Sequence, residues 1–373
     1  MRKDGARRSV FEGVKMGREG QRRSTGYFSH LGMHTAMKKV IVTGGAGFIG
    51  SHTVVELIAA GYEPVIVDDL RNSEERVLQG VAKIVGRMPM IHRIDCTDEK
   101  AFDKVFLEEG KVHGVIHFAA YKAVGESVAE PLKYYHNNIG SLVVLLRLMA
   151  KHAVKRLVFS SSCTVYGQPD VLPVTETSPD RVAQSPYGYT KVVCEQMLRD
   201  YGATDAAMKA VMLRYFNPIG AHPSGYIGEL PIGVPNNLVP YVTQTAAGIR
   251  ERLRVNGTDY NTPDGSCVRD YIHVVDLAKA HVAALDWADG SQAPLCEVFN
   301  LGTGHGNTVL EVVKTFMEVN GVDVPYELGP RRAGDVESVY ADTAKSKRVL
   351  GWECRYDLRD ALRDSWKWQQ ALI

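Results

Sequence analysis

The sequence predicts an α/β fold: a doubly wound, Rossmann-type parallel sheet with a smaller α/β C-terminal domain. Two patterns predict the sheet. Short apolar runs alternate with helical stretches at the spacing of βαβ units, and a glycine-rich turn joins the first strand directly to the first helix. A third pattern predicts the second domain, because after Phe216 the alternation gives way to loops rich in proline and glycine.

The elements of the predicted sheet follow in a regular order. The strands are nearly continuous apolar runs, which is typical of strands covered on both faces. We expect strands at 38–43, 64–67, 91–95, 114–118, 156–161 and 210–215. We expect helices at 51–60, about 137–152, around 187–191, 274–284, 311–319 and 358–369.

Composition indicates a soluble globular enzyme. The 373 residues are 45% hydrophobic and 23% charged with a net charge of +1, which argues against nucleic-acid binding. No apolar run approaches the roughly 18 residues of a membrane span. Six cysteines are spread widely without a C-x-x-C pair, so we expect no metal site and a reducing, cytoplasmic setting.

Residues 1–36 differ from the rest of the chain. They hold eight Lys/Arg and three Asp/Glu, with little apolar periodicity. We interpret them as a disordered basic extension. A targeting peptide is the alternative, although such peptides avoid the acids found at Asp4, Glu12 and Glu19.

The turn after the first strand predicts a bound dinucleotide. Gly44, Gly47 and Gly50 form G-x-x-G-x-x-G between strand and helix. Glycine allows close backbone approach to a pyrophosphate, whose charge meets the helix N-terminus. Asp68, which follows the second strand, can accept hydrogen bonds from the adenosine ribose and repel a 2′-phosphate, so NAD is favoured over NADP. Arg71 nearby leaves NADP as the alternative.

Tyr187 and Lys191 predict what is done with the dinucleotide. Residues four apart share one helix face, where a lysine ammonium can favour the ionised form of a phenol. Free tyrosine titrates near pH ~10, so a base that works near neutrality needs a shift of roughly 3–4 units. We expect Lys191 and the positive nicotinamide to supply it together.

Several motifs together resemble the extended short-chain dehydrogenase/reductase superfamily, and within it most closely the nucleotide-sugar 4-epimerases. They are the glycine turn, His117-Phe118-Ala119-Ala120, Ser160-Ser161-Ser162, Tyr187-x-x-x-Lys191, Tyr215-Phe216-Asn217-Pro218, Pro235-Asn236-Asn237-Leu238, Val268-Arg269-Asp270-Tyr271-Ile272-His273 and Arg331-Arg332-Ala333-Gly334-Asp335. The resemblance covers about residues 38–370.

The resemblance implies a function: reversible C4 epimerisation of UDP-galactose and UDP-glucose through a transient 4-keto sugar, with tightly bound NAD. It implies an NAD-binding domain at 37–216 and a UDP-sugar-binding domain at 217–373, with about 268–300 returning to the first. It also implies a homodimer joined through helices such as 137–152.

The resemblance also implies roles for individual residues. Tyr187 is the expected catalytic base, Lys191 its partner and Ser162 the proton relay. Residues expected to line NAD are Gly44, Gly47, Phe48, Ile49, Gly50, Asp68, Asp69, Asn72, Ser73, Asp95, Cys96, Phe118, Ala119, Ala120, Lys122, Asn137, Ser160, Tyr187, Lys191 and Tyr215. Residues expected to bind the UDP-sugar are Lys122, Ser162, Tyr187, Asn217, Asn237, Leu238, Asn256, Arg269, Arg332 and Asp335.

Some of these roles have alternatives. Asp69 and Asp95 also fit loop-capping residues, and Arg269 fits an ion pair with Asp270. Either Arg331 or Arg332 could face the diphosphate, and the resemblance favours Arg332.

The activity has alternatives as well. A nucleotide-sugar dehydratase would carry a carboxylate after the Ser160–Ser162 stretch, where this chain has Cys163-Thr164. A UDP-glucuronate 4-epimerase shares the serine-rich strand, and a non-catalytic NAD sensor shares the fold. Asn256 stands where relatives often have an aromatic residue near uracil. Val339 stands where some have tyrosine, so UDP-N-acetylhexosamines are a further expected substrate.

Overall fold

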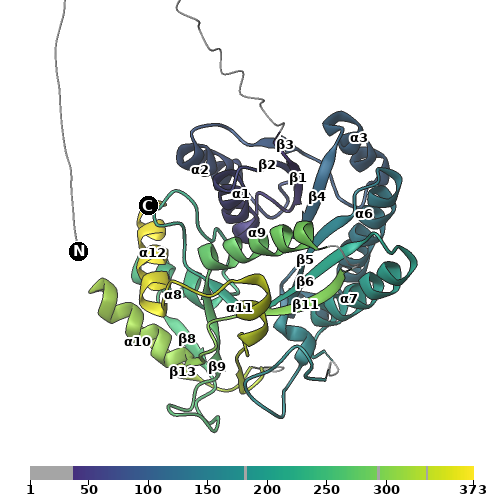
Figure 1. The fold of residues 1–373 in the computed structure, drawn as a ribbon. Helices are drawn as coiled ribbons and strands as arrows, with labels where there is room; N and C mark the ends of the chain where they lie inside the picture. Colours follow the sequence, from purple (N-terminus) through teal and green to yellow (C-terminus); the bar gives the residue numbers. More distant parts are fainter. Residues whose placement is uncertain (1–36, 180–182, 292–294, 333–334) are drawn as a thin grey trace, which may run out of the picture. The chain divides into compact units, whose positions relative to one another are not determined.

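The computed structural model describes residues 37–179, 183–291, 295–332 and 335–373 (Figure 1). The predicted extension 1–36 lies outside this range. The main element is a seven-stranded parallel sheet in the order β11-β6-β5-β4-β1-β2-β3. Its strands are β1 (Lys39–Thr43), β2 (Glu63–Val67), β3 (Met90–His92), β4 (Val112–His117), β5 (Arg156–Ser162), β6 (Lys209–Tyr215) and β11 (Leu295–Leu301). The predicted doubly wound sheet is confirmed.

Helices cover both faces of this sheet (Figure 1). Successive strand residues point to opposite faces, so Val40 and Val42 pack into one core while Ile41 packs into the other. The first core is completed by α1 (Phe48–Ala59), α2 (Glu75–Val85) and α9 (Val274–Gly290). The second is completed by α3 (Glu99–Glu109), α6 (Gly140–Lys151) and α7 (Pro186–Thr204).

A third core gathers later segments of the chain, including Ile219, Val242, Val255, Phe316 and Leu362. The elements around it are β7 (Asn217–Ile219), α8 (Leu238–Ala246), β8 (Leu253–Asn256), β10 (Tyr271–His273), α10 (Val309–Asn320), β13 (Tyr326–Gly329) and α12 (Leu358–Gln370). Near it lie β9 (Val268–Arg269), β12 (Asn307–Thr308), β14 (Ser338–Val339) and α11 (Ala344–Leu350). The middle of this late segment returns to the main sheet, because β11 pairs with β6.

The structure corrects three expectations about local elements. The third strand ends at His92 instead of reaching Asp95, because its pairing with β2 stops at Val67. The helix expected from 137 begins instead as a π-helical turn, η1 (Tyr135–Ile139), which α6 continues. The structure also contains short helices that the sequence did not indicate: α4 (Val124–Ala129), α5 (Pro131–Tyr134) and the 3-10 turn η2 (Cys163–Tyr166).

Candidate active site and cofactor site

The glycine turn between β1 and α1 is packed too tightly for side chains. A Cβ at Gly50 would lie 2.2 Å from the Gly44 carbonyl oxygen, and one at Gly44 would lie 2.9 Å from the Ala119 nitrogen. Gly44 also has a φ of 69°, which side-chain residues rarely adopt. Gly47 is the N-cap of α1, and Phe48 and Ile49 form its first turn. These residues fit a dinucleotide, whose pyrophosphate needs bare backbone at a helix N-terminus.

Asp68 lies beside this turn, directly after β2. Its carboxylate accepts from the Ala46 amide at 3.0 Å, the Leu70 amide at 2.9 Å and the Ser73 hydroxyl at 3.2 Å. Burial raises the pKa of this carboxyl, and these hydrogen bonds oppose the rise. Asn72 is exposed in the same loop. Asp68 therefore has a fixed orientation at the edge of the glycine turn.

Arg71 lies in the same loop and is held by acidic partners. It forms ion pairs with Asp69 and Asp95 and donates to the Tyr121 hydroxyl at 3.0 Å. Asp95 also accepts from the amide and hydroxyl of Thr97, so it caps its loop as well. Cys96, the next residue, is buried in the core.

The loop after β4 carries four of the predicted residues. Phe118 packs on His281 with 4.6 Å between ring centroids, and Ala119 and Ala120 follow it. Lys122 pairs with Glu229 at 3.2 Å. Asn137 donates to the Asn138 side chain at 3.0 Å.

Asn138, which the sequence did not single out, holds this loop in place. It is buried, accepts from the Tyr121 amide at 2.9 Å, and donates to the Tyr121 carbonyl at 3.0 Å and to the Thr190 hydroxyl at 3.2 Å. The π-helical turn brings this side chain inward, and a propensity pattern cannot reveal such a turn.

The predicted catalytic side chains come together at the carboxyl end of β5. Lys191, fully enclosed on α7, donates to the Ser160 carbonyl at 2.6 Å. Its nitrogen is 5.9 Å from the centroid of the Tyr187 ring. The Ser160 hydroxyl bonds to the Tyr215 hydroxyl on β6. Ser162 ends β5, and its hydroxyl caps η2 by accepting from the Thr164 amide at 3.2 Å.

The electrostatics of this cluster differ from the expectation for Tyr187. Burial raises the pKa of Tyr187 to about 12, although hydrogen bonding with Ser162 lowers it. Burial also lowers the pKa of Lys191 to about 8. Lys191 points to a carbonyl and not to the phenol, so the protein alone does not ionise Tyr187. Ionisation of Tyr187 near neutral pH would therefore need a further positive charge beside the phenol.

His117, at the end of β4, does not add a base to the cluster. Its Nδ1 and the Thr43 hydroxyl are 2.7 Å apart, and burial lowers the pKa of the imidazole to about 3. The side chain is therefore neutral at physiological pH.

A second group of predicted residues lies on the later segments. Asp335 connects two arginines: Arg332 donates to it at 2.7 Å, and Arg269 on β9 lies 3.8 Å from it. Arg331 turns away to Asp259, with its guanidinium 4.0 Å from the Tyr260 ring centroid. The structure therefore groups Arg332, and not Arg331, with Arg269.

Asp270 does not pair with Arg269. It accepts instead from the backbone of Thr303, Gly304 and Ala341. The alternative of an Arg269–Asp270 ion pair is wrong.

Glu229, which the sequence analysis did not single out, connects Lys122, after β4, with Asn237, on the later segments. Its carboxylate pairs with Lys122 and accepts from Asn237 at 2.5 Å. Asn237 is the N-cap of α8, and Leu238 begins that helix. Asn217 begins β7, and Asn256 ends β8 opposite Gly329. A lone glutamate in a loop has no sequence signal; only its two partners reveal it.

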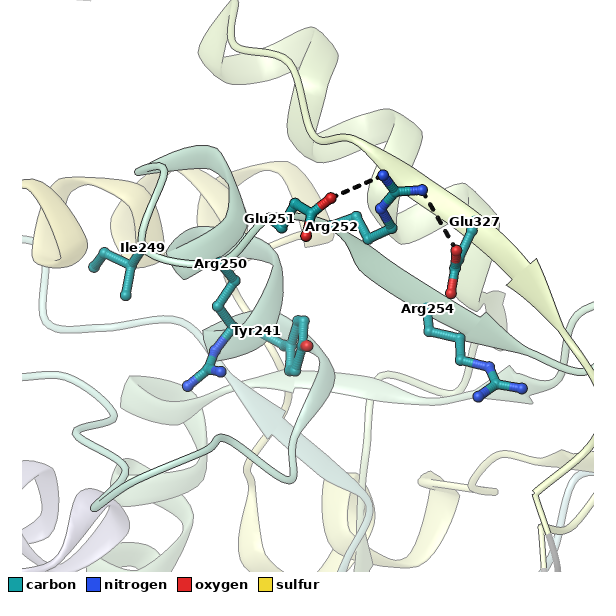
Figure 2. Close-up of a pocket in the computed structure, with 7 residues that line it drawn as sticks. All are labelled: Tyr241, Ile249, Arg250, Glu251, Arg252, Arg254 and Glu327. Atoms are coloured by element: carbon teal, nitrogen blue, oxygen red, sulfur yellow. Dashed lines mark hydrogen bonds and ion pairs between the residues drawn. The ribbon is translucent and has the colours of Figure 1, made fainter.

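A separate hollow of about 510 Å³ lies against α8, β8 and β13 (Figure 2). Arg252 crosses it between Glu251 and Glu327, at 2.9 Å and 3.6 Å. The other lining residues are Tyr241, Ile249, Arg250 and Arg254. None of the predicted site residues lines it, so it is distinct from the candidate active site.

The dinucleotide turn, the serine-ended β5 and the Tyr187–Lys191 helix define an enzyme of the extended short-chain dehydrogenase/reductase superfamily. A family model described as GDP-mannose 4,6 dehydratase matches residues 41–365. A UDP-glucose 4-epimerase of Dictyostelium discoideum is 54% identical over 331 residues, covering 89% of this chain and 95% of that protein. The chain belongs to the UDP-glucose 4-epimerase family.

Solved structures agree with this family. A UDP-glucose 4-epimerase from Stenotrophomonas maltophila, with bound NAD and formylated UDP-arabinopyranose, matches with a TM-score of 0.87 and 47% identity over 90% of this chain and 98% of that one. The enzyme from Bifidobacterium longum, in complex with NAD+ and UDP, matches with a TM-score of 0.86 and 48% identity at the same coverage.

Proposed function

We propose that this chain interconverts UDP-galactose and UDP-glucose by inverting C4 through a transient 4-keto sugar. The observation that carries the proposal is the convergence of Ser162, Tyr187 and Lys191 at the carboxyl end of β5, on the same edge of the parallel sheet as a glycine turn that excludes side chains. This arrangement serves oxidation of a carbinol, which a C4 centre without an acidic C–H requires.

Each catalytic side chain has a separate task. Tyr187 takes the proton of the C4 hydroxyl and later returns it, and Ser162 holds the C4 oxygen by a hydrogen bond and relays the proton. Lys191 is positively charged on the same helix face but donates to the Ser160 carbonyl, so it would supply only part of the shift that ionises the phenol. NAD bound at the glycine turn would supply the hydride acceptor and donor that this inversion needs.

The acidic setting of Arg71 supports NAD over NADP. A 2′-phosphate would need a free guanidinium near the adenosine ribose, whereas Arg71 pairs with Asp69 and Asp95. Asp68, whose carboxylate accepts from the Ala46 and Leu70 amides, is a further acidic residue in the same loop. The residues named above for the dinucleotide, from the glycine turn to Tyr215, would hold NAD.

Two arginines would hold the diphosphate of the UDP-sugar. Charge-assisted bonds from Arg269 and Arg332 suit a nucleotide that must stay anchored while its sugar turns over. Asp335 keeps both guanidinium groups at one place. The remaining contacts would come from Lys122, Asn217, Asn237, Leu238 and Asn256. In this assignment residues 37–216 bind NAD and 217–373 bind the UDP-sugar, with about 268–300 returning to the first domain.

Dehydration is disfavoured by the segment after Ser162. Elimination needs an acid or base there, and this chain has Cys163 and Thr164. Burial raises the pKa of Cys163 to about 12, so the thiol cannot replace a carboxylate near neutral pH. The product mass separates the two reactions, because epimerisation conserves mass and dehydration removes one water.

UDP-N-acetylhexosamines are proposed as additional substrates. Val339 is the small residue that leaves room for an acetamido group. It lies on β14 directly opposite Arg269, in a core shared with Tyr166 and Phe216. Conversion of UDP-N-acetylglucosamine at a rate comparable with UDP-galactose would support this, and no conversion would refute it.

A homodimer is proposed from the apolar surface of α4 to α7. Large apolar side chains are exposed there although these helices pack on one another. They are Val124, Val128, Leu132, Val143 and Tyr189. Sedimentation should give twice the chain mass, and Val143→Glu should shift it toward the monomer.

A cytoplasmic location stays a prediction from the cysteine pattern. All six cysteines are unpaired. No described helix combines the length and the apolar character needed to span a bilayer.

The decisive experiment uses purified protein with no added NAD. UDP-galactose is supplied and UDP-glucose is measured by proton NMR, with the mass of the product recorded. We expect an equilibrium mixture of the two sugars at constant mass. No conversion, even after NAD is added, would overturn the proposed function.

A further inference from the structure

Glu195 is a buried carboxylate behind the catalytic cluster, and the proposed reaction does not use it. It lies on α7 one turn after Lys191 and is 1% exposed. Four donor atoms reach it: Ser161 Oγ at 2.6 Å, Arg214 Nε at 2.8 Å and Nη2 at 2.6 Å, and Arg199 Nη2 at 2.9 Å. Burial works to raise the pKa of Glu195, but Arg214, Ser161 and Arg199 lower it below its usual range, so the group is ionised at neutral pH.

The partners of Glu195 come from the strands that carry the catalytic groups. Ser161 lies between Ser160, which accepts the Lys191 hydrogen bond, and Ser162. Ser161 and Arg214 are directly opposite each other in the β5–β6 pairing, and both donate to the same carboxylate. Glu195 therefore fastens α7 to both strands at the positions where catalytic geometry is set.

The network continues into the turn that follows Ser162. The Arg214 guanidinium lies 4.8 Å from the centroid of the Tyr166 ring. Tyr166 is the last residue of η2 and donates to the Asn300 side chain on β11 at 2.6 Å. A shift of Glu195 would reach the segment that Ser162 caps.

We propose that Glu195 is a positioning residue for the epimerisation: it fixes the placement of Lys191 relative to Ser162 and is the buried counter-charge of the Lys191 ammonium. This inference rests on the proposed function for its catalytic consequence. Its electrostatic part concerns Lys191 alone and can be measured without turnover.

The surroundings of Lys191 make Glu195 its main source of negative charge. Burial lowers the pKa of Lys191, and Cys194 and Glu195 oppose that change. Among the other described groups around the Lys191 ammonium, Arg214 is charged and forms an ion pair with Glu195. The remaining groups are neutral at pH 7. They are Tyr187 and Cys194 on α7, His117 on β4, the Phe159 ring and Ser160 carbonyl on β5, and Tyr215 on β6.

Two variants separate the effect of Glu195 on the placement of Lys191 from the effect of its negative charge. Ser161→Ala removes one hydrogen bond and keeps the charge. The double variant Glu195→Met with Arg214→Met removes both charges together, because losing only Glu195 would strand a buried guanidinium and threaten folding. The matched control is Asp205→Asn, which breaks the 2.6 Å pair with Lys155 at the other end of α7. Retained NAD and the melting temperature show that each variant is folded.

The expected results differ between the variants. In the double variant we expect kcat to fall at least about tenfold with little change in KM, since misplacement of catalytic groups acts mainly on the reacting state. The alkaline limb of its kcat profile, which we assign to loss of the Lys191 proton, should move to lower pH, by less than the roughly one unit expected for loss of an opposite charge alone, because the Arg214 charge is lost as well. Ser161→Ala should lower kcat without moving that limb, and Asp205→Asn should change neither.

An NMR titration of the Lys191 side chain gives a readout that does not depend on activity. We expect the pKa of Lys191 in the double variant to lie below that of the unaltered protein, by less than roughly one unit because the Arg214 charge is removed with that of Glu195. An unchanged Lys191 pKa, or an unchanged kcat in a folded double variant, would overturn the proposal. An inactive unaltered protein would overturn the proposed function instead, and the titration would still decide the role of the Glu195 charge.

Discussion

Replacing Gly50 by alanine should expel the dinucleotide while most of the fold remains. The new methyl group would lie 2.2 Å from the Gly44 oxygen and 2.8 Å from the Gly45 Cα, whereas side-chain carbons keep at least 3.0 Å. The backbone must therefore open by about 0.8 Å, at the turn that we propose to bind the pyrophosphate. Overpacking of this kind costs about 1–3 kcal/mol of stability. We expect NAD binding to weaken at least about 100-fold, or about 2.8 kcal/mol.

The assay compares NAD retained per chain after purification, NAD affinity by calorimetry on stripped protein, and the melting temperature. The matched control is Gly290→Ala, since a Cβ at Gly290 meets no atom within 4 Å. The control should retain NAD as the unaltered protein does. If Gly50→Ala kept its NAD with unchanged affinity, the inference that the tight backbone of this turn is needed to bind the dinucleotide would be wrong.

Four further predictions concern the site. Tyr187→Phe should abolish epimerisation and change the melting temperature little, as measured by NMR turnover and thermal unfolding; residual turnover above about 1% would contradict a role as sole base. Lys191→Met should also be inactive, yet more stable at pH 7. In the folded protein the pKa of Lys191 is about 8, below the ordinary 10.5, so keeping its ammonium buried costs about 3 kcal/mol of folding free energy at pH 7. This cost disappears as the pH rises from 8 to 10.5, because the folded protein then holds Lys191 uncharged. Loss of the hydrogen bond to the Ser160 carbonyl offsets about 1 kcal/mol of the stability gained by Lys191→Met. Denaturant unfolding should show that the remaining gain in unfolding free energy shrinks as the pH approaches 10.5. Because the pKa of His117 is about 3 when folded, stability should fall by up to roughly 5 kcal/mol between pH 6.5 and 3; His117→Gln should flatten this acid loss, and an identical acid profile would contradict it. Val339→Tyr should keep UDP-galactose conversion and lose that of UDP-N-acetylglucosamine, in paired turnover assays; equal loss of both would count against a size filter.

Local patterns were sufficient for the features that depend on neighbouring residues. The glycine turn, the alternation of strands and helices, and the Tyr187–Lys191 spacing are all contained in short stretches of chain. They predicted the sheet, the order of its strands and helices along the chain, and the helix that carries Tyr187 and Lys191. The predicted end of the third strand at residue 95 was wrong, because β3 stops at His92, where its pairing with β2 stops.

Contacts between distant segments were decided only in three dimensions. Nothing local shows that Arg332 turns to Asp335 while Arg331 turns to Asp259, or that Glu229 joins Lys122 to Asn237. The same holds for charge: the pKa of Tyr187 rises because the packed fold removes water from the phenol. The sequence by itself determined which groups are present and along which strands they lie. The tertiary structure decided their partners and protonation, because both depend on burial that segments far apart create together.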